Sequence, residues 1–460
     1  MPTNWSPLLG GELRERALEA VHAIAESLSA GKFPPGPLRH GEAEAASLAG
    51  GRAGLGVLYA YLAQAGLARR GSEVSERFLG EAAEALAAAH MTPSLYEGFT
   101  GVAWATEHVN GRLFDSEGEE RNEAIDEALR GYVSQSPWGH DYDLVSGLVG
   151  IGVYALERLP RPGARTLLEL VIERLSESAE LEPQGITWHT APDLLPDWQR
   201  ELCPKGYYNL GLAHGVPGVM ALLGGACAAG IARKGAGPLL EGAVQWLLAQ
   251  RLPAGGGSSF SKWTGPGIEP TPARSAWCYG DPGVAAALLC AARGAGEPAW
   301  EREALAIARR AVERPPEQAG VRDAGLCHGA AGLGHVFNRM YQATGDSRLA
   351  EAARSWFARA LEMRQPGRGI AGFAACYPEK DGTESWVAEP GILTGAAGIA
   401  LALLAAATPI EPAWDRMLLV LEKTSPSTAP VARAPRSRTG AGPRQRPRGG
   451  RDEKQAGTEG

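Results

Sequence analysis

The chain has 460 residues, and its 45 Lys and Arg against 52 Asp and Glu give a net charge of -7. This acidic balance argues against a nucleic-acid-binding protein, because phosphate contacts need a surplus of basic side chains. We expect no secretory signal in the polar residues 1–16, and the longest apolar stretch, 392–407, is too short to span a bilayer, so it is predicted to be a buried helix.

Glycine is unusually frequent, with 61 positions, and its spacing is regular. The motif G-x-x-G precedes an apolar, helix-forming run seven times, beginning at Gly51, Gly98, Gly147, Gly215, Gly280, Gly329 and Gly395. The steps between these glycines are 47, 49, 68, 65, 49 and 66 residues, which is a period near 47 with three insertions of similar size. Such a period is typical of a helical repeat architecture.

A second helix of different character is predicted ahead of each motif. Residues 12–29 place Leu13, Val21 and Ile24 on one apolar stripe and their charges on the opposite face. Comparable amphipathic helices are predicted to start near Glu73, Glu119, Ala164, Ala236, Trp300 and Arg348. The helices after the glycines are apolar on nearly all sides, which indicates burial. Seven outer and seven inner helices form either an open solenoid or a closed ring. The small residues of the inner helices favour closure, so we predict an all-α fold, an α/α toroid of seven helix pairs.

Residues just ahead of the glycine motifs are predicted to meet at one end of the toroid, because all inner helices begin there. Cys278 and Cys327 occupy the same repeat position, and His214, Tyr279 and His328 share the next one. Two thiolates and an imidazole, from Cys278, Cys327 and His328, are a ligand set that zinc prefers, with the fourth position open. We therefore predict one Zn²⁺ ion here; the alternative is that these are ordinary small core residues.

His214 shares this end of the toroid without a neighbouring ligand residue. An imidazole beside a metal centre suits a proton donor or acceptor, and the alternative is a structural, hydrogen-bonded histidine. Asp143 is a candidate partner for it, with a helix cap as the alternative. His335 lies about 10 Å along a helix from His328, too far for the same ion, and is predicted to be packed inside. Four further cysteines are predicted to be core or loop thiols: Cys203, Cys227, Cys290 and Cys376.

These motifs resemble the lanthionine synthetase C-like (LanC) family, the cyclases of lantibiotic biosynthesis. The resemblance spans about residues 10–423 and rests on YDLV at 142–145, NLGLAHG at 209–215, RSAWCYG at 274–280, CHG at 327–329 and WDRMLL at 414–419. It implies a seven-pair α/α toroid with a central zinc held by Cys278, Cys327 and His328. It also implies acid/base roles for His214 and Asp143 and active-site roles for Arg274 and Tyr279.

The activity that the resemblance implies is a Michael addition. Cysteine thiols of a dehydrated precursor peptide add to dehydroalanine or dehydrobutyrine, forming lanthionine or methyllanthionine rings. His214 would then deliver a proton to the α-carbon, and Arg274 or Tyr279 would steady the oxyanion. The expected partners are the precursor peptide, a dehydratase and, as a further candidate, a peptide transporter. We expect a cytoplasmic protein, with a peripheral place at the membrane if such a complex forms.

Two other classes of function stay open. One is a LanC-like enzyme that adds glutathione or another thiol to dehydrated residues in proteins. The other is a non-catalytic toroid that binds a peptide or a thiol. An α/α-barrel glycosidase is disfavoured, because it needs facing carboxylates and this end of the toroid is rich in Cys and His.

The C-terminal region has no counterpart in the resemblance. Residues 425–460 hold eight Lys and Arg, three Asp and Glu, and many Pro and Gly. Such a composition is typical of disorder. We therefore predict a toroid domain over 1–424 and a disordered tail over 425–460. A dispensable extension is favoured over an arm that binds a membrane or a partner.

Overall fold

The computed structural model describes residues 5–29, 42–88, 90–114, 121–253, 255, 257–379 and 382–420. These residues belong to one structural unit, Met1–Lys423. The predicted tail, 425–460, lies outside the described residues.

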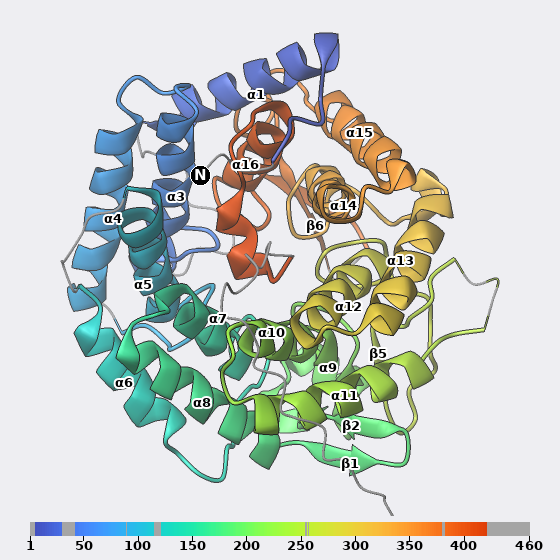
Figure 1. Cartoon of the computed structure of the whole chain (residues 1–460). Helices are drawn as coiled ribbons and strands as arrows, with labels where there is room; N and C mark the ends of the chain where they lie inside the picture. The colour runs from blue at the N-terminus through green and yellow to red at the C-terminus, as the bar shows by residue number, and fades with distance from the viewer. Residues whose placement is uncertain are drawn as a thin grey trace, which may run out of the picture. The chain divides into compact units, whose positions relative to one another are not determined.

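Seven buried helices form an inner ring, and each begins directly after the first glycine of a G-x-x-G motif (Figure 1). They are α3 (Arg52–Gln64), α5 (Phe99–Glu107), α7 (Leu148–Arg158), α10 (Val216–Ala228), α12 (Asp281–Ala295), α14 (Ala330–Thr344) and α16 (Ala396–Ala407). Each packs against the next, and α16 contacts α3, so the ring is closed. The predicted α/α toroid is confirmed.

Seven amphipathic helices surround the inner ring (Figure 1). They are α1 (Gly11–Ser29), α4 (Gly71–Ala88), α6 (Glu123–Val133), α8 (Pro162–Glu177), α11 (Arg233–Ala249), α13 (Pro298–Glu313) and α15 (Ser347–Glu362). Each from α4 onward packs on the inner helix that precedes it in the chain, since that connection is the shorter one. The first outer helix, α1, has no inner helix before it and packs against the last inner helix, α16.

The N-terminal segment closes the toroid by satisfying the end of α16. The last carbonyl groups of a helix have no partner within it. The Trp5 indole N–H donates to the Ala405 oxygen at 2.8 Å, and the Leu8 amide donates to the Ala406 oxygen at 2.8 Å. The two ends of the repeat array are therefore joined by hydrogen bonds as well as by packing.

Close backbone approach explains the repeated glycines. A Cβ at Gly101 would lie 1.9 Å from the Leu95 carbonyl oxygen, and the second glycine of every motif meets such an oxygen at between 1.8 and 2.6 Å. Gly280 in addition has a φ of 88°, which L side chains rarely adopt. The loops ahead of the inner helices thus fold tightly over the helix starts.

The three insertions contain short antiparallel strands, which the sequence did not predict. The strands are β1 (Glu180–Glu182), β2 (Gly185–Thr187), β3 (His189–Thr190), β4 (Tyr207–Asn209), β5 (Trp263–Thr264), β6 (Ala375–Pro378) and β7 (Glu384–Val387). They form the sheets β1-β2, β3-β4-β5 and β6-β7. In the middle sheet Asn209 lies opposite Trp263, so this sheet joins the insertions on either side of α10 and α11.

Short helices complete the described chain. They are α2 (Glu42–Ala46), the π-helix η1 (His108–Leu113), the 3₁₀ turns η2 (Pro192–Leu194) and η3 (Pro316–Gln318), α9 (Asp197–Leu202) and the 3₁₀ helix η4 (Ala413–Leu418). Within the described residues, every helix is too short or too polar to cross a membrane. The apolar stretch at 392–407 contains α16, which is buried along its whole length, as predicted.

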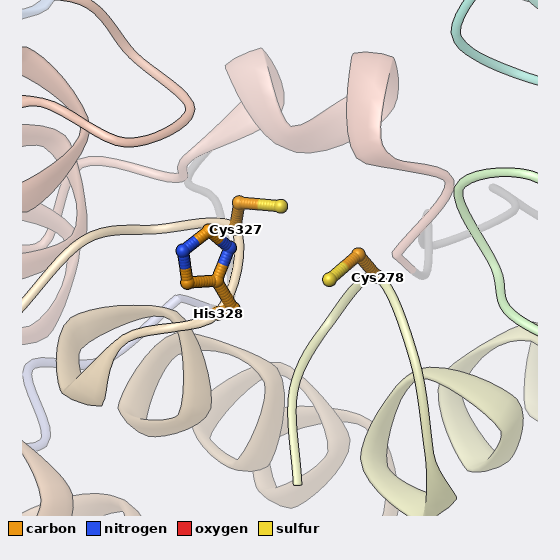
Figure 2. A group of neighbouring side chains, drawn as sticks. All are labelled: Cys278, Cys327 and His328. Atoms are coloured by element: carbon orange, nitrogen blue, oxygen red, sulfur yellow. The ribbon is translucent and has the colours of Figure 1, made fainter. Parts of the chain in front are cut away.

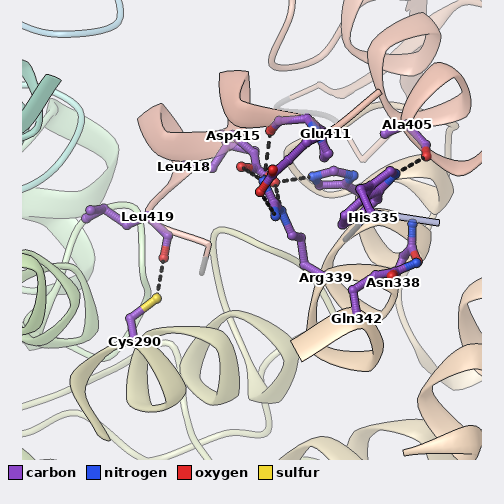
Figure 3. A network of polar contacts seen from close by, with 12 residues as sticks. Cys290, His335, Asn338, Arg339, Gln342, Ala405, Glu411, Asp415, Leu418 and Leu419 are labelled. Atoms are coloured by element: carbon purple, nitrogen blue, oxygen red, sulfur yellow. Dashed lines mark hydrogen bonds and ion pairs between the residues drawn. The ribbon is translucent and has the colours of Figure 1, made fainter. Parts of the chain in front are cut away.

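The C-terminal segment, defined here as residues 413–420, lies inside the toroid (Figures 1 and 3). Asp415 pairs with His335 and Arg339 of α14, and Arg416 pairs with Glu157 of α7. The segment therefore connects two inner helices that are not neighbours in the ring.

Candidate functional site

Backbone hydrogen bonds connect the loops that precede the inner helices. The Leu144 amide donates to the Ala213 oxygen at 3.2 Å, and the Ala213 amide donates to the Cys278 oxygen at 3.4 Å. The Cys278 amide donates to the Cys327 oxygen at 3.3 Å, and the Cys327 amide donates to the Leu393 oxygen at 2.6 Å. These bonds connect the loops of five repeats and bring the candidate residues of four of them to one end of the toroid.

Two thiols and an imidazole form the centre of this site. The sulfur atoms of Cys278 and Cys327 and a ring nitrogen of His328 all lie within 4.8 Å of one another. Figure 2 shows the two sulfur atoms pointing into the same space, with the His328 ring beside Cys327. The neighbouring Cys327 thiol holds the pKa of Cys278 well below its usual value, while the Cys278 sulfur and burial raise the pKa of Cys327.

The chemistry of these three donors fits zinc. Thiolate sulfur and imidazole nitrogen are preferred Zn²⁺ ligands, and three protein ligands leave one position for a substrate. Burial alone would lower the pKa of His328, but the Cys278 sulfur outweighs burial and raises it. The other four cysteines of the described chain lie outside the group: Cys203, Cys227, Cys290 and Cys376.

His214 and Asp143 form a pair at the same end. Nδ1 of His214 lies 2.6 Å from Oδ2 of Asp143, and 40% of the His214 side chain is exposed. Burial would lower the pKa of His214, but the Asp143 carboxylate more than offsets this and raises it. Asp143 also accepts from the Ser146 amide at 2.7 Å, so it both binds the histidine and stabilises the turn before α7.

Arg274 acts electrostatically on the two cysteines, and Tyr279 packs against His214. The positive charge of Arg274 lowers the pKa of both Cys278 and Cys327. The Tyr279 ring stacks on the His214 ring with 6.3 Å between centroids. Burial holds the pKa of Tyr279 well above its usual value, so the phenol stays neutral and can donate a hydrogen bond.

Sequence reasoning assigned no role to three further residues of this site. Burial and the Asp143 charge raise the pKa of Asp141 to about 6. The Lys262 charge favours the anionic form of Cys278, and burial lowers the Lys262 pKa. Asn209 donates to the Tyr279 hydroxyl at 3.0 Å. Asn209 lies in the motif segment 209–215, and Asp141 directly precedes the motif segment 142–145, so both could have been detected. Lys262 lies in an insertion that gave no signal.

His335 stays apart from this group, as predicted. Its side chain is fully buried, and Nε2 lies 2.8 Å from Oδ2 of Asp415.

Comparison with known proteins identifies the family. The pattern of the family described as "Lanthionine synthetase C-like protein" matches residues 42–419. The nisin biosynthesis protein NisC of Lactococcus lactis subsp. lactis is 26% identical over 263 residues, which cover 53% of this chain and 61% of that protein. The solved structure of a nisin cyclase superimposes with a TM-score of 0.67 at 21% identity, covering 88% of this chain and 97% of that one. The matched sequence thus spans less than two thirds of the curated relative. The chain belongs to the lanthionine synthetase C-like family.

Proposed function

We propose that this protein is a lanthipeptide cyclase. It adds a cysteine thiol of a dehydrated precursor peptide to dehydroalanine or dehydrobutyrine and so forms a lanthionine or methyllanthionine ring. The observation that carries this proposal is the placement of the Cys278, Cys327 and His328 donors beside the His214–Asp143 pair. Membership of the LanC-like family supports it.

Cys278, Cys327 and His328 would hold one Zn²⁺ ion. When bound, the ion supplies the positive charge that makes an incoming thiol acidic near neutral pH. Its two thiolate ligands offset that charge, so the substrate sulfur keeps its electron density as a nucleophile. The Arg274 guanidinium adds a further positive charge beside the sulfur atoms.

The protein side chains then manage the addition. The substrate sulfur forms a bond to the β-carbon, and the electron pair of the carbon–carbon double bond moves to the α-carbon and its carbonyl oxygen. Arg274 and the neutral Tyr279 phenol would stabilise the negative oxygen of this enolate. The α-carbon takes one proton, which replaces the proton that the thiol lost.

His214 is the proposed source of that proton. Its Nδ1 faces Asp143, so its Nε2 is turned away from the carboxylate, and 40% of the side chain is exposed. The raised pKa of His214 keeps more of the imidazole protonated near neutral pH than in an ordinary histidine. Asp143 therefore acts on the reaction through the orientation and charge of His214.

A cyclisation assay tests the proposal. Purified protein is mixed with a dehydrated peptide that contains one cysteine, and free thiols are trapped over time, because ring closure leaves the mass unchanged. We expect the wild-type protein to consume the free thiol of the peptide and to bind about one zinc per chain. The variants Cys278→Ala, Cys327→Ala and His328→Ala should neither bind zinc nor consume the thiol. Cys227→Ala, which removes a buried thiol of α10, is the matched control and should change neither.

The same assay separates the alternatives. Glutathione adducts without ring closure would indicate an enzyme that joins a free thiol to dehydrated residues. Zinc binding without any thioether would indicate a toroid that binds peptide or thiol without catalysis. Full zinc content in all three ligand variants would overturn the metal assignment. Pull-down of a dehydratase or a transporter would test the proposed biosynthetic complex.

A further inference from the structure

Asn209 is buried against Tyr279, a residue of the proposed active site. Its side chain is fully inaccessible to solvent, at the end of β4 and five residues before His214. Its two polar ends have different partners. Oδ1 accepts from the Gly211 amide at 2.9 Å, and Nδ2 donates to the Tyr279 hydroxyl at 3.0 Å.

These two contacts determine where the phenol proton points. Because the Gly211 N–H is a donor, the atom facing it must be the carboxamide oxygen, so the NH₂ group of Asn209 faces Tyr279. The Tyr279 oxygen therefore acts as an acceptor toward Asn209, and its own O–H must point elsewhere. Within the described residues Asn209 is its one hydrogen-bond partner, and Tyr279 as a whole residue is partly exposed. The proton is thus left for a group that enters the site.

Gly211 makes room for this arrangement. A Cβ at position 211 would lie 2.5 Å from the Cys278 carbonyl oxygen and 2.6 Å from the Tyr279 ring. The ring therefore packs directly on the backbone of residue 211. The short segment from Asn209 to His214 thus contacts Tyr279 twice. Asn209 donates to its hydroxyl, and the His214 ring stacks on its ring.

We propose that Asn209 is a positioning residue, which fixes Tyr279 with its oxygen as acceptor toward the protein and its O–H as donor toward the substrate carbonyl oxygen. This inference rests on the proposed function, because the acceptor is the oxygen that becomes negative when the thiol adds. Asn209 does not touch the substrate. It acts by preventing the Tyr279 O–H from donating a hydrogen bond to a protein group.

The substitution Asn209→Asp tests this orientation with almost no change of shape. A carboxylate still accepts from the Gly211 amide, but it presents a second acceptor to Tyr279, which then donates its proton inward. We expect kcat to fall by about 10²-fold, the usual effect of losing one oxyanion donor, with a much smaller change in KM. The double variant Asn209→Asp/Tyr279→Phe should be no slower than Tyr279→Phe alone, since both lose the same donor.

Two further variants keep the test decisive. Asn209→Ala removes the amide donor without adding charge and should also lower kcat while zinc content stays at one. Asn338→Asp places a carboxylate at another fully buried asparagine, on α14, and is expected to leave kcat unchanged. An Asn209→Asp variant with wild-type kcat, or effects of Asn209→Asp and Tyr279→Phe that simply multiply, would overturn the inference.

A readout that needs no turnover separates this inference from the proposed function. Tyrosines are labelled with ¹³C at Cζ, and the Tyr279 signal of the zinc-loaded protein is assigned by its absence in Tyr279→Phe. This signal should shift in Asn209→Asp and stay in place in Asn338→Asp. If it shifts but the wild-type protein closes no ring, the proposed function fails and the contact stands. If the wild-type protein is active and the signal does not move, the positioning role fails.

Discussion

Two histidine–aspartate pairs lie in this toroid, and they differ in access. His214 and Asp143 meet at 2.6 Å at the N-terminal ends of the inner helices, with 40% of the imidazole side chain exposed. His335 and Asp415 meet at 2.8 Å between α14 and the C-terminal segment, and both side chains are buried (Figure 3). The distances are nearly equal, so the contact alone does not distinguish an active-site histidine from a structural one.

The neighbouring charge explains why the two imidazoles behave differently. Asp415 also accepts from Arg339 at 2.8 Å, and this guanidinium neutralises the carboxylate that His335 would need as a counter-charge. Burial therefore lowers the pKa of His335, although Asp415 opposes the shift. At His214 burial is outweighed by Asp143, and the pKa is raised. The Asp415 carboxylate is shared with Arg339 and holds the C-terminal segment against α14. The Asp143 carboxylate instead raises the pKa of His214 and so supports the protonated imidazole that a general acid needs.

Removing Arg339 should produce the largest effect on stability. In Arg339→Met the Asp415 carboxylate stays buried without its guanidinium, and breaking a buried pair in this way lowers the free energy of unfolding by about 3–5 kcal/mol. The ring closure rate of the folded fraction should not change, because the pair lies away from the sulfur atoms. Urea unfolding at constant zinc concentration measures the first quantity, and the thiol-trapping assay measures the second.

Arg302→Met is the matched control for that substitution. Arg302 is exposed on α13, so its loss should change the free energy of unfolding by less than about 0.5 kcal/mol. An Arg339→Met protein that is as stable as Arg302→Met would show that the buried charges do not hold the C-terminal segment. A loss of activity with full stability and zinc would instead place this region in the reaction.

The sequence predicted one of these regions far better than the other. The residues before the G-x-x-G motifs could be assigned to one end because the motif repeats and sets their position on the helices. His335 could be recognised as a packed residue from its spacing to His328. Its partner Asp415 lies 80 residues away in the chain, and the partner of Arg416, Glu157, lies 259 residues away. No local pattern reports such pairs.

The insertions show the same limit. Three extra segments were visible as longer steps between glycines, but their short strands were not, because two- to four-residue strands carry no measurable alternation. Lys262 lies in one of these segments and was missed for that reason. Asn209 lay within a recognised motif, yet its role depends on the geometry of a hydrogen bond, which residue types alone do not give.

His214→Asn should have the next largest effect, and on rate instead of stability. We expect ring closure to slow by about 10²-fold or more, the usual contribution of a general acid, with zinc content unchanged. Asp143→Asn should show the same defect in weaker form, because it removes only the charge that supports the imidazole.

His335→Asn should do the opposite and lower the unfolding midpoint without slowing the reaction of the folded protein. Wild-type rate and stereochemistry in His214→Asn would make His214 a structural histidine like His335.

The pH dependence of these variants sharpens the contrast. If protonated His214 is the acid, kcat falls as pH rises through its raised pKa, and Asp143→Asn moves that fall to lower pH. The pair's contribution to stability is fully present below about pH 6.5, the ordinary histidine pKa, and is lost as pH rises through the folded-state pKa. For His335 the sign is reversed: its lowered pKa gives stability that is present above about pH 6.5 and is lost on acidification.

Deleting residues 425–460 should have the smallest effect of all, and it tests where the structural role of the C-terminal region ends. Asp415 and Arg416 hold the segment inside the toroid, and Trp277 and Tyr96 bind its backbone at the Leu418 and Met417 oxygens. The deleted residues are rich in Pro, Gly and Arg and lack the apolar side chains that join a core, so we expect unchanged zinc content and a melting temperature within a few degrees of the full chain. Truncation after 410 should instead destabilise the protein as strongly as Arg339→Met, because it removes both charged anchors. A larger drop in melting temperature on deletion of 425–460 would show that the tail packs on the toroid. Weaker binding to a dehydratase or to anionic vesicles, with stability unchanged, would make it a docking arm.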